Sequence, residues 1–151
     1  MMKKILAAVD GSDHAWKALN LAADMAKLHG AELVILHVVP YEDVPEALRQ
    51  FAEVEHVPLE EERARYQYAK ALSDGLTRQA EAWVRSNGLT AVSAHAAEGK
   101  AADVILEFAK NEAADTIVLG SRGVGYVSGM LLGSVSHKVA NLADVTCVVV
   151  K

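Results

Sequence analysis

The sequence has little cysteine, few aromatic residues and no long apolar run. Its 151 residues include one cysteine, two tryptophans and three prolines. A single cysteine excludes an internal disulfide and fits a reducing compartment. No apolar run approaches the roughly 20 residues that span a bilayer, and the N-terminus lacks the apolar stretch and cleavage site of a signal peptide. We therefore expect a soluble, cytoplasmic protein that does not contact membranes.

The sequence also lacks a cluster of basic residues. The net charge is −5, and residues 42–62 hold eight acidic residues and one arginine, a local charge of −7. Domains that bind nucleic acid usually carry a clustered basic face, so we expect no nucleic-acid partner. The acidic segment is open to three interpretations: a solvated loop, which we favour, a flap beside a ligand crevice, or a surface for an unknown protein partner.

Hydrophobic residues make up 52% of the chain, although aromatic residues make up only 5%. This composition predicts a compact core of Ala, Val, Leu and Ile. A chain of 151 residues is long enough to bury one full core, so we expect a single domain over residues 1–151.

Five short apolar runs alternate with helical patterns along the chain. The runs at 5–9, 32–39, 90–96, 116–119 and 145–150 predict strands. Because they are apolar at consecutive positions, they should be covered on both faces, as in a parallel sheet. Four amphipathic helices are predicted between them, the first capped by Ser12 and Gly30. The fold class is therefore α/β, an open five-stranded parallel sheet of order 3-2-1-4-5 with helices on both faces.

The second predicted helix is the hardest to place. Prolines at positions 40, 45 and 58 argue against a continuous helix across residues 41–58. The helical pattern resumes after Pro58 and runs to Gly88. Its apolar positions are Ala64, Tyr68, Leu72, Leu76 and Trp83. We expect Tyr68 and Trp83 to pack in the core rather than to stack on a base.

A glycine-rich stretch follows the fourth strand. The run Thr116–Leu119 leads into glycines at 120, 123, 125, 129 and 133, and Gly133-Ser134 opens an amphipathic helix. Glycines let backbone N–H groups approach an anion closely, and the N-terminus of the following helix presents unpaired N–H groups and the positive end of its dipole. Strand, loop and helix together predict a phosphate site, although the same glycines could serve only a tight turn over the sheet.

The glycine spacing distinguishes between known phosphate loops. Residues 129–134 are one residue short of a Walker A loop and lack its lysine, and residues 123–129 have one residue too many for the dinucleotide fingerprint. The pattern Gly120-x2-Gly123-x9-Gly133-Ser134 resembles the nucleotide signature of the universal stress protein family. The resemblance extends from KKILAAVDGS near the N-terminus to CVVVK at the end.

This resemblance implies a Rossmann-like fold of the adenine nucleotide alpha hydrolase type. In the ATP-binding branch of the family, ATP lies between the loops after the first and fourth strands. The main chain near Val38 would then meet the adenine ring, and Gly120 would lie on the ribose side. A homodimer joined along the edge strand 145–150 is also implied, and pairing would protect this apolar edge.

Two distant segments should border one crevice, because strands one and four are neighbours in the predicted order. Asp10 could accept a hydrogen bond from a sugar hydroxyl or the adenine amine, or serve only as a turn residue. Gly123 and Gly133 would present amides to phosphates, and Arg122 would cover a phosphate or remain an exposed loop residue. The candidate nucleotide-binding residues are Asp10, Gly11, Ser12, Val38, Gly120, Ser121, Arg122, Gly123, Gly133, Ser134 and Val135.

Mg²⁺ or Mn²⁺ would bind through phosphate oxygens and water, with Ser134 at most joining its shell, so we predict no metal cage made by the protein. No catalytic residue is predicted, because the loop has no lysine and no obvious base beside it. The sequence thus predicts an ATP-binding regulatory module of the stress response with little or no hydrolysis. A slow ATPase and a nucleotide-free dimeric adaptor are the alternatives. A phosphoacceptor receiver is disfavoured, because no aspartate ends the third strand.

Overall fold

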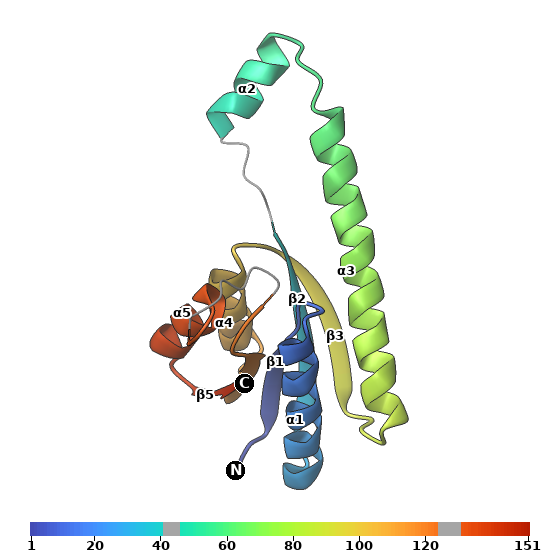
Figure 1. Ribbon diagram of the computed structural model, residues 1–151, viewed down its shortest axis with the longest axis vertical. Coiled ribbons are helices and arrows are strands. Elements are labelled where there is room, and N and C mark those ends of the chain that lie inside the picture. Colours follow the sequence, from blue (N-terminus) through green and yellow to red (C-terminus); the bar gives the residue numbers. More distant parts are fainter. Residues whose placement is uncertain (41–45, 124–130) are drawn as a thin grey trace.

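Five parallel strands form one sheet with all their carboxyl ends at the same edge (Figure 1). The structure, a computed structural model, describes residues 1–40, 46–123 and 131–151. The strands are β1 (Lys4–Ala8), β2 (Glu32–Pro40), β3 (Val92–Gly99), β4 (Thr116–Gly120) and β5 (Thr146–Val150). They pair in the order β3-β2-β1-β4-β5. The predicted fold class and strand order are therefore confirmed.

Helices cover both faces of this sheet. In chain order the described helices are α1 (Asp13–His29), α2 (Glu46–Val54), α3 (Glu60–Ser86), α4 (Ala101–Asn111) and α5 (Ser134–Leu142). One apolar cluster joins the sheet to α1 and the C-terminal half of α3, and a second joins it to α4 and α5. Within the described ranges, no helix is both long and apolar enough to cross a membrane.

The central strand β1 shows why consecutive apolar residues suit this architecture. Ile5 and Ala7 belong to the cluster under α1 and α3, whereas Leu6 belongs to the cluster under α4 and α5, and all three are fully buried. Burying an Ile or Leu side chain stabilises a fold by about 1.5–3 kcal/mol. The loop after β1 is therefore anchored to a strand that is packed on both faces.

Helix α1 begins and ends at the predicted caps. The Ser12 side chain accepts a hydrogen bond from the backbone N–H of Ala15 at 3.3 Å. Gly30 adopts φ = +64°, the left-handed conformation that commonly ends a helix, because glycine has no Cβ to clash there. Since Ser12 lies two residues after Asp10, the cap also fixes where the loop after β1 turns.

Helix α3 buries a different face from the one predicted. Its buried residues are Ser73, Thr77, Ala80 and Val84. Tyr68 is 68% exposed and Trp83 is 37% exposed, so the expectation that both pack in the core is wrong. The N-terminal half of α3 extends past the end of the sheet (Figure 1), and no core is available there for Tyr68.

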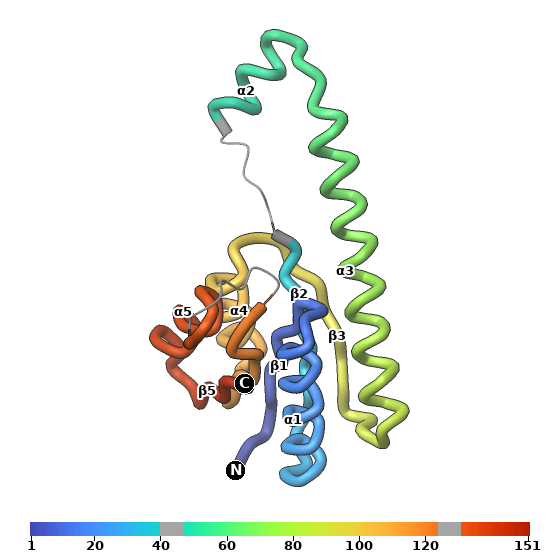
Figure 2. The backbone as a smooth tube through the Cα atoms, viewed as in Figure 1, coloured from blue at the N-terminus to red at the C-terminus, as the bar shows by residue number. Residues whose placement is uncertain are grey.

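Part of the acidic segment forms α2, which the sequence analysis did not predict. The prolines at 45 and 58 lie on either side of Glu46–Val54 and do not interrupt it. Helix α2 lies beyond the end of β2, and α3 returns from there to the sheet (Figure 2). The interpretation of the acidic segment as a solvated loop is therefore wrong for residues 46–54.

Candidate functional site

Two loops meet at the carboxyl edge of the sheet, one after β1 and one after β4. The strands pair in parallel, with Ala8 opposite Leu119, so both loops leave the sheet at the same level. Helix α1 follows the first loop on one face and α5 follows the second on the other. Such a switch point opens a crevice beyond the strand ends, where ligands of open α/β sheets bind.

Asp10 connects these two loops. Its Oδ1 accepts hydrogen bonds from the Ser12 backbone N–H at 2.9 Å and from the Ser12 hydroxyl at 2.5 Å, so it is a turn residue. Its Oδ2 points at the other loop, because a Cβ added to Gly123 would lie 2.5 Å from that oxygen. Asp10 and Gly123 therefore lie next to each other, and a larger residue at position 123 would displace the Asp10 carboxylate.

Gly120 packs against the start of α1. A Cβ added there would lie 2.9 Å from the carbonyl carbon of His14 and 3.0 Å from the backbone nitrogen of Ala15. Both are backbone atoms, so they have little freedom to move aside. This glycine has a packing reason of its own, in addition to any contact with a ligand.

The loop after β4 closes on the N-terminus of α5. The backbone N–H of Gly133 donates to the Ser121 carbonyl oxygen at 2.6 Å, and the Ser136 hydroxyl donates to the same oxygen at 2.9 Å. The Ser121 backbone N–H in turn donates to the Val150 carbonyl oxygen at 2.7 Å. These bonds fix the start of α5 beside the end of β4, although residues 124–130 between them lie outside the described part.

Ser136 and Ser121 both have polar atoms buried at this junction. Ser136 is 2% exposed and also donates to the Gly133 carbonyl oxygen at 3.1 Å, so its hydroxyl is bound. The Ser121 hydroxyl is buried and has no hydrogen-bond partner among the described residues. Sequence analysis missed Ser136, although its position three residues after the helix-opening Gly133 is a signal for a first-turn contact.

Helix α5 begins at Ser134 with Gly133 as its N-cap. Glycine has no side chain to accept hydrogen bonds from the first-turn amides, and the structure shows no side-chain cap there. Ser134 is exposed and Val135 half-buried, the latter against the α4–α5 cluster. Among the described residues, therefore, no side chain caps the first turn of α5.

The remaining predicted residues lie around the same edge. Gly11 is exposed, at φ = +83°, with the Leu76 methyl groups 3.9 and 4.0 Å from where its Cβ would be. Arg122 is half-buried in the loop after β4. Val38 is half-buried on the face towards α4, and its backbone pairs with Ala97 of β3. Gly125 and Gly129 of the glycine-rich stretch lie outside the described residues.

A histidine whose charge is influenced by Asp10 lies on β2, where the sequence predicts a strand. His37 lies near the end of β2, and its Nδ1 shares a hydrogen bond of 2.5 Å with the hydroxyl of Ser73, which is 1% exposed. Burial lowers the pKa of His37, and the negative charge of Asp10 acts in the opposite direction. His37 therefore contacts α3 through Ser73, and the charge of Asp10 partly offsets the effect of burial on its pKa.

The described residues contain no group of three or more His, Cys, Asp or Glu side chains that could hold a metal ion. Lys138, four residues after Ser134 in α5, pairs with Asp103 of α4 at 2.7 Å. The described part of the site thus combines glycine-lined backbone, the Asp10 carboxylate, serine hydroxyls and the Arg122 guanidinium. That set can bind a polar, anionic ligand, and it does not supply a ready nucleophile.

Fold and site together define an open parallel α/β protein whose β1 and β4 loops meet at its switch point. The chain belongs to the universal stress protein family, which it matches over residues 1–151. Two curated relatives are similar over almost their whole length. A Thermus aquaticus protein named "Universal stress protein in QAH/OAS sulfhydrylase 3'region" is 39% identical over 150 residues, covering 97% of this chain and 96% of the relative. Universal stress protein YxiE of Bacillus subtilis is 35% identical over 156 residues, covering 100% of both.

Solved structures of the family share the fold. Universal stress protein UspA from Lactobacillus plantarum superposes with a TM-score of 0.83 at 24% identity, covering 99% of this chain and 98% of the other. A universal stress protein in complex with cAMP gives 0.73 at 23% identity, covering 99% and 97%. One from Archaeoglobus fulgidus in complex with dAMP gives 0.62 at 21% identity, covering 100% and 98%.

Proposed function

We propose that this chain binds ATP at the crevice between the β1 and β4 loops and acts as a nucleotide-dependent regulatory module of the stress response. The observation that carries the proposal is the contact between the loops, where a Cβ added to Gly123 would lie 2.5 Å from Asp10 Oδ2. A carboxylate acceptor and a side-chain-free backbone then lie next to each other. Adenine nucleotides need both: an acceptor for their hydroxyl or amino groups and amides for their phosphates.

Each part of the nucleotide has candidate partners in the chain. Gly123, Gly133 and the first turn of α5 would present amides to the phosphates, with the Ser134 hydroxyl beside them. Asp10 would accept from the ribose or the adenine amine, and the main chain at Val38 would border the ring. Gly11, Ser12, Gly120, Ser121, Arg122 and Val135 complete the proposed site. The adenine nucleotides bound in the cAMP and dAMP complexes of family members support this ligand class.

A divalent cation fits this site only as a companion of the phosphates. Among the described residues Asp10 is the one carboxylate at the crevice, and its Oδ1 already accepts two hydrogen bonds from Ser12. Mg²⁺ or Mn²⁺ would offset phosphate charge while holding mostly water and phosphate oxygens. The chain would contribute at most the Ser134 hydroxyl.

Binding with little or no hydrolysis follows from the side chains near the loops. Phosphoryl transfer to water needs a group that orients the water and a cation that balances the developing charge. Lys138 pairs with Asp103, and His37 shares a hydrogen bond with Ser73. Arg122 is the described cation within the loop after β4. We therefore propose binding with little turnover, because the described loop residues include no histidine, glutamate or lysine that could act as a base beside the phosphates.

Saturation with ATP and Mg²⁺ should raise the melting temperature of the protein. At a free ATP concentration about 100 times the dissociation constant, binding stabilises the folded state by about 2.7 kcal/mol, or roughly 5–10 °C in a domain of this size. Differential scanning fluorimetry measures the shift, with equal Mg²⁺ and inorganic phosphate as the control. No shift beyond the control would reject nucleotide binding, and steady phosphate release that a Ser134→Ala change abolishes would favour the slow ATPase.

We also propose that two copies pair along β5. This strand, TCVVV, lies at the edge of the sheet next to β4, and its last four residues are only half-buried. A Val148→Lys change places a charge on that edge and should raise the dissociation constant of the homodimer about ten-fold. Sedimentation equilibrium measures this, and Leu28→Lys, at a residue that is 81% exposed on α1, is the control. Equal association of the two variants would contradict pairing through β5.

A further inference from the structure

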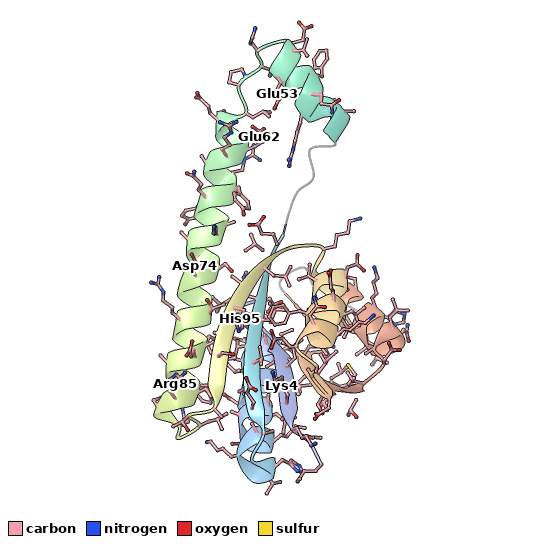
Figure 3. All side chains as sticks on the ribbon, turned by 180° about the vertical axis from the view of Figure 1, so that it is seen from behind. Lys4, Glu53, Glu62, Asp74, Arg85 and His95 are labelled. Carbon is pink, nitrogen blue, oxygen red and sulfur yellow. The ribbon has the colours of Figure 1, made fainter. Side chains whose placement is uncertain are left out.

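A surface groove between α1 and α3 brings together both tryptophans of the chain. Its volume is about 320 Å³, and its lining residues are Trp16 and Asn20 of α1 and Gln79 and Trp83 of α3. Figure 3 labels Asp74 and Arg85 on the part of α3 that runs beside the sheet, and Gln79 and Trp83 lie between these two positions in the sequence. None of the candidate nucleotide-binding residues lines this groove.

Each wall of the groove contributes one indole and one amide. Trp16 and Asn20 lie four residues apart, as do Gln79 and Trp83, so each pair shares one face of its helix. Trp16 is half-buried against the core cluster under α1 and α3, whereas Trp83 is 37% exposed. Tryptophan side chains are highly buried on average. Two of them at one open groove therefore indicate a binding surface.

The polar groups of the groove are rich in hydrogen-bond donors. Each indole carries one N–H donor, and the side-chain amides of Asn20 and Gln79 each carry an NH₂ group and one acceptor oxygen. Within the described part of the chain, these groups form no hydrogen bond with another residue. A ligand that fits the groove therefore has flat apolar faces for the indoles and acceptors for these donors.

The lining disfavours charged ligands and enclosed small molecules. None of the four lining residues is charged, whereas phosphates, nucleic acids and anionic headgroups are bound by Lys and Arg side chains. Small-molecule pockets bury about 70–90% of their ligand. Here Asn20, Gln79 and Trp83 are all exposed, so the groove is open along its length. An open neutral groove suits a segment of an extended polymer better than an enclosed small molecule.

The known ways in which proteins bind peptide segments narrow the choice further. Addition of a strand needs a free strand edge, but both walls of this groove are helices. An amphipathic helix needs anchor pockets over several of its turns, whereas four side chains line this groove. A polyproline II segment has flat proline rings and carbonyl oxygens that make no internal hydrogen bond, and it binds in grooves lined by aromatic side chains. The groove matches both requirements.

We propose that the groove between α1 and α3 binds a proline-rich segment of a partner protein in the polyproline II conformation. The proline rings pack on Trp16 and Trp83, and the segment's carbonyl oxygens accept hydrogen bonds from Asn20, Gln79 and the indole N–H groups. Proline has no backbone N–H that would need an acceptor, which suits a lining made mostly of donors. This binding does not depend on the proposed nucleotide site.

Tryptophan fluorescence of the full chain tests this binding directly, because both tryptophans line the groove. Titration with a polyproline peptide of about ten residues should give a saturable change in emission, and a glycine–serine peptide of the same length should give none. In isothermal titration calorimetry, Trp83→Ala should weaken polyproline binding at least about ten-fold. The matched control is Tyr68→Ala, which removes an exposed aromatic side chain of α3 outside the groove and should leave the affinity unchanged.

A second variant does not involve the partly buried indole. Gln79→Ala should weaken polyproline binding about two- to ten-fold through the lost hydrogen bond, whereas Gln67→Ala, at another exposed glutamine of α3, should not. Both positions are exposed, so neither change should unfold the chain. The inference is overturned by no saturable response to polyproline, by an equal response to the glycine–serine peptide, by equal affinity of Gln79→Ala and Gln67→Ala, or by a response to the neutral sugar maltose in place of polyproline.

Discussion

A Gly123→Ala change should weaken ATP binding about 10- to 100-fold while leaving the protein folded. The added Cβ would lie 2.5 Å from Asp10 Oδ2, so the carboxylate must move. The fold tolerates this movement, because the displaced atom is the end of a side chain and not backbone. The proposed ligand, however, loses a hydrogen bond to a charged group, a contact worth about 1.5–3 kcal/mol. Isothermal titration calorimetry measures the loss, and the urea midpoint reports the fold.

The matched control is Gly75→Ala, which adds the same methyl group elsewhere. Gly75 lies within α3, and a Cβ there meets no atom within 4 Å. Alanine should stabilise this helix position by up to about 1 kcal/mol and leave ATP affinity unchanged. If Gly123→Ala binds ATP as tightly as Gly75→Ala, then the contact between Asp10 and Gly123 serves only loop packing and the proposed site is wrong.

The features that sequence could predict depend on local signals. Ser12 and Gly30 bound α1 because each meets a need of the neighbouring backbone that few other residues meet. Strand order followed from apolar runs that alternate with helices. The order places β1 beside β4, so Asp10 and Gly123 had to meet at one edge although more than 100 residues separate them.

Periodicity alone could not show whether the apolar residues Tyr68 and Leu72 of α3 are exposed or belong to the core. Spacing shows that Tyr68 and Leu72 share a helix face, but not whether that turn of the helix lies over the sheet. The lengths of helix and strand show that it does not. Helix α3 has 27 residues and spans about 40 Å, whereas the adjacent strand β3 has 8 residues and spans about 26 Å. The excess of α3 extends beyond the sheet, and its first turns are exposed.

The hydrogen bond between His37 and Ser73 was hidden for a different reason. The residues lie 36 positions apart on a strand and a helix, and their contact depends on how α3 is rotated against β2. Within α3, Ser73 looks like an ordinary polar surface residue, yet it is 1% exposed. A polar residue at a buried position is visible only once the packing is known, and it then points directly to its partner.

Removal of the Ser73 hydroxyl should destabilise the protein by about 0.5–1.5 kcal/mol, because Ser73→Ala removes the hydrogen bond to Nδ1 of the half-buried His37. His37 also predicts a pH dependence. Burial lowers its pKa below the ordinary value of 6.5, so the unfolded chain binds the proton more readily. The stability contributed by neutral His37 is therefore complete above pH 6.5 and is lost as the pH falls through the lowered pKa.

Urea unfolding between about pH 7.5 and about pH 5.5 measures the loss of stability on protonation of His37. A His37→Gln change should reduce this loss, because glutamine can pair with Ser73 but does not titrate. His95→Gln is the matched control, since His95 is an exposed strand histidine beside Phe108 on the other face of the sheet. Its pH profile should follow that of the unmodified protein. If His37→Gln and His95→Gln give the same profile, then His37 does not link protonation to the stability of the Asp10 loop.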